Sequence, residues 1–254
     1  MRVTSLTDSI LPESDFQDPA RSCLDNKGPH LLIIDGFYED PDAVRALALS
    51  KRFVRYSPPL AEQAGADMAS LPLFRDAKGV WEASVLLRFR GRPVAHPFDG
   101  FRHNPASIRS QMEKITGDRV DADSWALGGD GWNGAFHRQF GGPISAAIHH
   151  HYKDGDVYPR GWSGLVYLTP DAPADAGTSI WRLRETGKCV AAKGAKFFGE
   201  DDAFELAYLV ENKYNRLVLF RENVLHRVES SAAQNPPMRL TQTFFFKAAC
   251  ERQK

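Results

Sequence analysis

Residues 214–227, YNRLVLFRENVLHR, contain the pattern that most directly indicates the fold. Within this stretch, residues 215–221 have the length and apolar centre of a short strand. The run 223–227, NVLHR, follows at once and carries His226. A short strand followed directly by a second short run is typical of β-structure with tight turns.

The second half of the chain repeats this pattern. Clusters of glycine, proline and aspartate, such as residues 128–131 (GGDG) and 171–173 (DAP), separate the apolar runs. A segment with an acidic start, residues 201–212, is predicted to be a helix inserted between strands. Many short strands spaced by turns predict a β-sandwich or barrel. The further strands are predicted at 124–127, 134–140, 144–151, 163–169, 178–183 and 239–247.

Two helices are predicted in the first half. Asp40 can cap a helix whose first turn contains Pro41, and this helix is predicted to run to about Lys51. The pair Asn104-Pro105 repeats the signal, and the second helix is predicted to end at Gly117. The fold class is therefore mainly β with flanking helices.

The remaining segments of the first half define the domain organisation. Residues 31–35 and 84–90 are predicted strands, and residues 56–79, rich in proline, alanine and glycine, are predicted to form an extended loop. Residues 1–28 are polar without sustained periodicity and are predicted to be a flexible arm. We expect residues 29–254 to form a single domain.

Composition limits the classes of partner. Lysine plus arginine equals aspartate plus glutamate, 32 each, which argues against nucleic acid or a membrane as the main partner because both attract a basic excess. Cys23, Cys189 and Cys250 share no short spacing and are expected to be reduced thiols. Residues 1–20 lack the apolar run of a signal peptide, and no apolar stretch has the length of a membrane span. We expect a soluble, cytoplasmic protein that acts on a small molecule or peptide; nothing in the sequence specifies its oligomeric state.

Three consecutive histidines, His149-His150-His151, end one predicted strand. Side chains alternate along a strand, so His149 and His151 share one face. Imidazole is a good ligand for iron, zinc, copper and nickel. A solvated polar strand end is the competing interpretation of this run taken alone.

Four strings together carry a resemblance to a known family. They are residues 164–170 (GLVYLTP), 177–182 (GTSIWR), 214–220 (YNRLVLF) and 239–246 (RLTQTFFF). Their order resembles the Fe(II)/2-oxoglutarate-dependent dioxygenases, in particular the prolyl-4-hydroxylase-like branch and a bacterial family within it. The resemblance covers about residues 140–248, with weaker support from residues 33–49. It implies a double-stranded β-helix (jelly roll, cupin-like) that uses Fe(II) and 2-oxoglutarate.

The resemblance also assigns roles to individual residues. His226 matches the distal iron ligand, and Arg239 matches the basic residue that pairs with the far carboxylate of 2-oxoglutarate. Thr241, two residues on and therefore on the same face, matches a hydroxyl that assists it. A guanidinium suits this role because it binds a carboxylate through two parallel hydrogen bonds. Tyr167 is a candidate for lining the same pocket, as is Trp181, although aromatic residues in such strands more often belong to the core.

The chain departs from the family at the proximal pair of ligands. The family pattern is His-x-Asp, whereas this sequence has His149-x-His151. Three explanations are open: a three-histidine site with His149, His151 and His226, a carboxylate from Asp154 or Asp156 beside His151, or a site that has lost its metal. We favour them in that order. A neutral imidazole in place of aspartate raises the net charge of the site by one.

The main hypothesis from sequence is an Fe(II)- and 2-oxoglutarate-dependent oxygenase that hydroxylates a small molecule or a peptide side chain. Two alternatives are a three-histidine, cupin-like dioxygenase that does not use 2-oxoglutarate, and a metal-free binding module on the same fold. Residues 56–104 and 184–212 are predicted to cover the substrate side, because loops on a rigid sandwich carry specificity. His137 is expected to be structural.

Overall fold

The computed structural model describes residues 2–5, 30–56, 80–85, 88–89, 92–93, 100–140, 147–151, 161–192, 201–229 and 238–249. An eight-stranded antiparallel sheet dominates them, in the order β1-β2-β11-β8-β13-β7-β4-β3. Its strands are β1 (Arg2–Ser5), β2 (Leu31–Asp35), β3 (Val54–Tyr56), β4 (Val80–Ala83), β7 (Phe136–Phe140), β8 (Gly161–Tyr167), β11 (Arg216–Arg221) and β13 (Arg239–Lys247).

A second sheet has three strands in the order β10-β9-β12. They are β9 (Thr178–Leu183), β10 (Phe204–Val210) and β12 (His226–Val228). A short pair, β5 (Arg88–Phe89) and β6 (Arg92–Pro93), stands apart from both sheets. The helices are α1 (Pro41–Leu49), α3 (Ala106–Thr116) and α4 (Ala122–Gly131), with one 3₁₀ turn, η5 (Asp201–Ala203).

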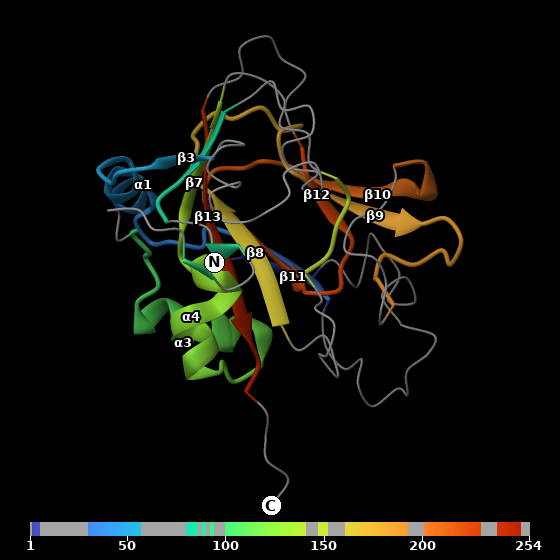
Figure 1. Ribbon diagram of the computed structural model, residues 1–254, viewed down its shortest axis with the longest axis horizontal. Coiled ribbons are helices and arrows are strands. Elements are labelled where there is room, and N and C mark those ends of the chain that lie inside the picture. The colour runs from blue at the N-terminus through green and yellow to red at the C-terminus, as the bar shows by residue number, and fades with distance from the viewer. Residues whose placement is uncertain are drawn as a thin grey trace, which may run out of the picture.

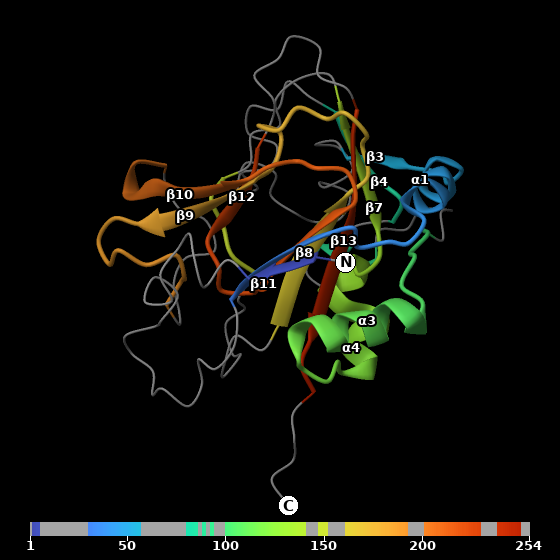
Figure 2. The ribbon, with the colours of Figure 1, turned by 180° about the vertical axis from the view of Figure 1, so that it is seen from behind.

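The strand order is that of a double-stranded β-helix. From β7 onward the chain passes back and forth between the sheets, which gives the order β7-β13-β8-β11 in the large sheet. His149 forms a bridge to His226 and so extends the small sheet to 149-β12-β9-β10. This topology confirms the predicted jelly roll. Figures 1 and 2 show the small sheet on one side of the large sheet and helices α3 and α4 on the other side, beside β13.

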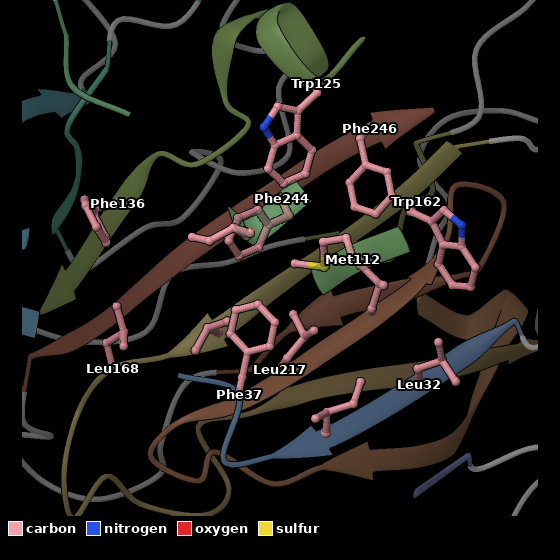
Figure 3. Packing of buried hydrophobic residues seen from close by; sticks show 14 of the residues in the cluster. Leu32, Phe37, Met112, Trp125, Phe136, Trp162, Leu168, Leu217, Phe244 and Phe246 are labelled. Atoms are coloured by element: carbon pink, nitrogen blue, oxygen red, sulfur yellow. The ribbon is translucent and has the colours of Figure 1, made fainter. Parts of the chain in front are cut away.

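Two hydrophobic clusters account for these layers. Alternate residues of β11 belong to different clusters. Leu217 and Leu219 face the helices, whereas Val218 and Phe220 face the small sheet. Figure 3 shows the first cluster, in which Met112 of α3 and other labelled side chains pack on the outer face of the large sheet. Among the described helices, none is long and apolar enough to cross a membrane.

Both helices predicted from proline signals are present. The Asp40 carboxylate accepts a hydrogen bond from the backbone N–H of Ala43 at 2.9 Å, as a capping residue should, although α1 ends at Leu49 rather than near residue 51. The second helix ends at Gly117, whose φ of 73° is in the left-handed region. Its predicted cap was wrong, because the Asn104 amide donates to the Trp125 carbonyl instead.

Three predicted elements were wrong. Residues 124–127 lie within α4, because the Asp121 carboxylate accepts from the Ser124 N–H at 2.7 Å and starts a helix there. Residues 201–212 form a 3₁₀ turn and β10, which pairs with β9 along its length. The strand expected at 84–90 is displaced: β4 ends at Ala83, and β5 contains only two residues.

Of the remaining predicted elements, some are present and others lie outside the described residues. The strands expected at 178–183 and 239–247 are present with those bounds, and the one at 31–35 is β2. Strand β1 lies within the expected arm and pairs with β2. Residues 6–29, the loop at 57–79 and residues 144–146 lie outside the described part of the chain.

Candidate metal centre

Three histidines converge at one end of the space between the sheets. His149, His151 and His226 each offer a ring nitrogen, and these nitrogens lie within 4.8 Å of one another. The Nε2 atoms of His151 and His226 are 3.1 Å apart. Two nitrogens that bind one metal at right angles, each about 2.1 Å from it, are about 3 Å apart. The spacing of this pair therefore fits two adjacent ligands of one metal ion.

Backbone pairing holds the cluster together. His149 and His226 exchange both backbone hydrogen bonds, N–H to O, at 3.0 and 2.9 Å. The N–H of His151 donates to the carbonyl of Glu222 at 2.7 Å, and His226 stands opposite Ile180 of β9. The histidines of two distant segments are thus fixed in register with each other by main-chain contacts.

The second nitrogen of two rings is bound by a backbone carbonyl. Nδ1 of His149 lies 2.9 Å from the Ala147 carbonyl, and Nδ1 of His226 lies 2.8 Å from the Val224 carbonyl. A carbonyl only accepts hydrogen bonds, so Nδ1 carries the proton and Nε2 presents a lone pair. Such contacts orient histidine ligands in metal sites and fix their tautomer.

Burial keeps the imidazoles of His149 and His226 neutral. It lowers the pKa of His149 to about 4 and holds the pKa of His226 well below its ordinary value. The ring of Phe220 lies 4.3 Å from that of His226, centroid to centroid, and the ring of Phe245 lies 5.0 Å from that of His151. Neutral imidazoles in apolar surroundings are ready to bind a cation without first losing a proton.

Arg239 is a buried cation farther along the same space. Its Nε donates to the carbonyl of Ala176 at 3.0 Å, and Nη1 donates to Oε1 of Gln139 at 3.0 Å. Nη2 lies 3.5 Å from the carbonyl of Gly177. Among the described residues, no carboxylate forms an ion pair with this guanidinium. Burial lowers its pKa, but a guanidinium stays charged, so this site favours an anion.

Thr241 and Tyr167 lie beside Arg239. They stand opposite each other in the pairing of β13 with β8, and both are buried. The Tyr167 hydroxyl lies 2.8 Å from the Thr178 hydroxyl, and the Tyr167 ring is 5.4 Å from the guanidinium carbon of Arg239. Burial raises the pKa of Tyr167, so the phenol remains protonated. The three residues grouped from the sequence are therefore neighbours in space.

Arg239 lies against the residues just before β9, and the histidine cluster lies against β9 itself. Arg239 contacts the carbonyl of Gly177, and His226 is opposite Ile180, three residues farther along. At about 3.3 Å per residue, these two points on the strand are about 10 Å apart. Asp154 and Asp156, the alternative ligands, lie outside the described residues.

Other residues of the region have clear positions. His137 is buried with both ring nitrogens bound: Nδ1 accepts from Trp81 Nε1 at 3.2 Å, and Nε2 lies 3.0 Å from the Thr243 hydroxyl. This arrangement agrees with the structural role expected for it. Trp181 packs against a separate cluster with Leu225, away from the space between the sheets. Glu222 was not singled out from the sequence, because its contact with His151 is made by a backbone carbonyl.

No protein-family model matches the chain, and no curated protein matches it in sequence. Several solved structures are similar to it. A prolyl-4-hydroxylase from Pseudomonas putida is 18% identical with a TM-score of 0.38, and the match covers 87% of this chain and 94% of that one. The α-ketoglutarate-dependent epimerase SnoN of nogalamycin biosynthesis is 12% identical with a TM-score of 0.47, covering 89% and 81%. HygX from Streptomyces hygroscopicus, with nickel, 2-oxoglutarate and hygromycin B bound, is 16% identical with a TM-score of 0.33, covering 86% and 83%.

Proposed function

We propose that this protein is an Fe(II)- and 2-oxoglutarate-dependent oxygenase with a three-histidine iron site. One observation carries the proposal: three imidazoles converge in a jelly roll that also buries a guanidinium without a carboxylate partner among the described residues. A metal site alone would suit many enzymes. A metal site together with a buried cation for an anion suits a co-substrate that is both a chelator and a dicarboxylate.

Each residue has a role in this proposal. His149, His151 and His226 hold the iron through their Nε2 atoms, and the carbonyls of Ala147 and Val224 orient two of these rings. Bound iron with 2-oxoglutarate and oxygen supplies the oxidising power for attack on a C–H bond of the substrate.

The co-substrate has its own set of contacts. Arg239 binds the far carboxylate of 2-oxoglutarate, assisted by the hydroxyl of Thr241, while Tyr167 forms one wall of the pocket. We place the substrate, a small molecule or a peptide side chain, on the metal's open side. The proposed location in the cell is the cytoplasm.

A second candidate is a three-histidine dioxygenase that does not use 2-oxoglutarate. The histidine at position 151, where the related pattern has aspartate, favours it. In that enzyme Arg239 would be structural, held by Gln139 and the carbonyl of Ala176. The third possibility, a metal-free binding module, predicts that a folded protein takes up no iron.

An anaerobic Fe(II) titration with and without 2-oxoglutarate tests these alternatives. The proposal predicts one iron per chain and a visible charge-transfer band that requires 2-oxoglutarate. His226→Ala should abolish iron binding, and His30→Ala, at a buried histidine outside the cluster, is the matched control. Tight iron binding without the band would favour the second candidate, and absence of iron binding would favour the binding module.

A further inference from the structure

A row of aromatic rings leads away from the candidate metal centre. The His151 ring lies 5.0 Å from the Phe245 ring at an interplanar angle of 84°. Phe245 lies 6.3 Å from Trp132, also edge to face, and Trp132 lies 5.4 Å from Trp81. These centroid distances are those of rings in contact. The aromatic surface formed by Phe245, Trp132 and Trp81 is therefore continuous with one of the three histidines.

Exposure singles out two members of this surface. The side chains of His151, Phe245 and Trp132 are partly exposed, whereas Trp81 is 8% exposed and lies behind them. His149 and His226 are 9% and 4% exposed, so the open side of the histidine cluster is at His151. Among the described residues, the partly exposed rings beside that open side are those of Phe245 and Trp132.

The aromatic surface is held rigidly from behind. Trp81 donates its Nε1–H to His137, whose other ring nitrogen is bound to the Thr243 hydroxyl. That hydroxyl also bonds the backbone carbonyl of Trp132 at 3.0 Å. The Trp132 ring also contacts the His137 ring in a tilted arrangement, at 5.0 Å between centroids. A ring that is fixed before binding loses little conformational entropy when a ligand stacks on it.

The aromatic surface carries no charge. Burial lowers the pKa of His137 to about 3, so this imidazole is neutral near pH 7, and the rings of Phe245, Trp132 and Trp81 are uncharged. Fixed, partly exposed rings present flat apolar faces, which favour a planar partner that can stack on them over a flexible chain. Arg239, a buried cation whose charge also acts on His137, is already assigned to the co-substrate.

We infer that Phe245 and Trp132 form a stacking site for a planar aromatic ring of the substrate, next to the open side of the metal. This inference rests on the proposed function, because it treats the histidine cluster as the reaction centre. It narrows the substrate class from any small molecule or peptide side chain to one that presents an aromatic ring. Phe245 and Trp132 are specificity-determining residues in this assignment.

Binding of 2-naphthol tests the stacking site, with its saturated counterpart decahydro-2-naphthol as the control ligand. The protein is loaded with Co(II) or Zn(II) and 2-oxoglutarate without oxygen, and affinity is measured by calorimetry. Paramagnetic broadening of the naphthol protons by Co(II), absent with Zn(II), reports that the ring lies near the metal. N-acetyltryptophanamide is titrated in parallel. Tighter binding of this compound than of 2-naphthol would indicate an aromatic side chain of a peptide as the substrate, and the reverse would indicate a free aromatic molecule.

We expect 2-naphthol to bind at least about tenfold more tightly than the saturated alcohol, with Co(II)-dependent broadening. Trp132→Leu and Phe245→Leu should each weaken it by about tenfold. Trp181→Leu, a partly exposed tryptophan outside the space between the sheets, should leave the affinity unchanged. If Trp132→Leu does not fold, Phe245→Leu alone gives the comparison with Trp181→Leu.

Equal affinity for the two alcohols, no broadening by Co(II), or no effect of either substitution would overturn the inference. Failure of the proposed function has a different signature, namely a protein that binds neither Co(II) nor Fe(II). In that case the calorimetric comparison of Trp132→Leu with Trp181→Leu still decides whether the aromatic surface binds a flat ring.

Discussion

Replacement of Arg239 by glutamine separates the co-substrate role of this residue from a structural one. The substitution removes the guanidinium but keeps a side chain that can donate to the carbonyl of Ala176. Without the guanidinium, the far carboxylate of 2-oxoglutarate loses two charge-assisted hydrogen bonds. Each such hydrogen bond contributes about 1.5–3 kcal/mol, and the lower part of that range, about 1.5–2 kcal/mol for each of the two, gives a loss of about 3–4 kcal/mol. We therefore expect the affinity for 2-oxoglutarate to fall by roughly 100- to 1000-fold.

The same substitution should change stability little. The glutamine amide can replace the guanidinium hydrogen bond to the Ala176 carbonyl, and loss of the other charge-assisted bond, at 3.0 Å to Gln139, costs about 1.5–3 kcal/mol. Removal of a buried cation without a carboxylate partner among the described residues offsets part of this cost. The free energy of unfolding in the absence of ligand should change by less than about 2 kcal/mol.

The assay is a titration of anaerobic Fe(II)-loaded protein with 2-oxoglutarate, followed by the charge-transfer band. 2-Oxopentanoate, which has the same chain but no far carboxylate, is the second ligand. Wild type should prefer 2-oxoglutarate strongly, whereas Arg239→Gln should bind both alike. Arg182→Gln, at a partly exposed arginine of β9 that pairs with Glu205, is the matched control. If folded, iron-loaded Arg239→Gln still binds 2-oxoglutarate with wild-type affinity, the co-substrate role assigned to Arg239 is wrong.

Three other perturbations test the fold and its charges. Gly164→Ala would place a Cβ 2.3 Å from the Val218 carbonyl oxygen, so we expect the chemical-denaturation midpoint to fall by the equivalent of more than about 2 kcal/mol; a neutral change would contradict the close strand contact. Phe244→Ala, at a fully buried position, should cost about 3–5 kcal/mol in the same measurement. Burial lowers the pKa of His30 from 6.5 to about 4, so the unfolded chain binds a proton that the folded one does not, and stability should fall by about 3 kcal/mol as the pH drops from 6.5 to 4. His30→Asn should remove about this much of the pH dependence of the metal-free protein, to which His137 and His149 also contribute, and an unchanged pH profile would show that His30 is not buried in its neutral form.

The sequence predicted those strands that have an alternating or continuous apolar pattern of their own and that lie between other strands in a sheet. Residues 178–183 and 239–247 gave the observed bounds because their local pattern and their sheet environment agree. Residues 201–212 were assigned wrongly because the acidic start resembles a helix N-terminus. What decides their conformation is pairing with β9, a contact that no local pattern contains.

Residues 124–127 illustrate the opposite case. Their apolar pair and the glycines that follow suggested a strand and a turn, but the deciding interaction is local. The carboxylate of Asp121 caps the helix by accepting from the N–H of Ser124. A capping aspartate three residues before the segment was therefore the signal that could have predicted α4.

The candidate site was only partly predictable. Alternation placed His149 and His151 on one face, and the resemblance supplied His226 and Arg239. The convergence itself depends on the backbone pair between His149 and His226, which lie in segments far apart in the sequence. The environment of Arg239 was also hidden, because its partners are backbone carbonyls and the amide of Gln139. Contacts made by backbone atoms do not depend on the side chain, so the residue types in the sequence do not reveal them.

X-ray absorption at the iron K-edge tests the central claim most directly, because scattering from imidazole rings counts histidine ligands. The anaerobic Fe(II) protein with 2-oxoglutarate should show three imidazoles, and His151→Ala should show two. Two imidazoles in the wild type, with a spectrum unchanged by His151→Ala, would contradict the three-histidine site and move the third ligand to Asp154 or Asp156.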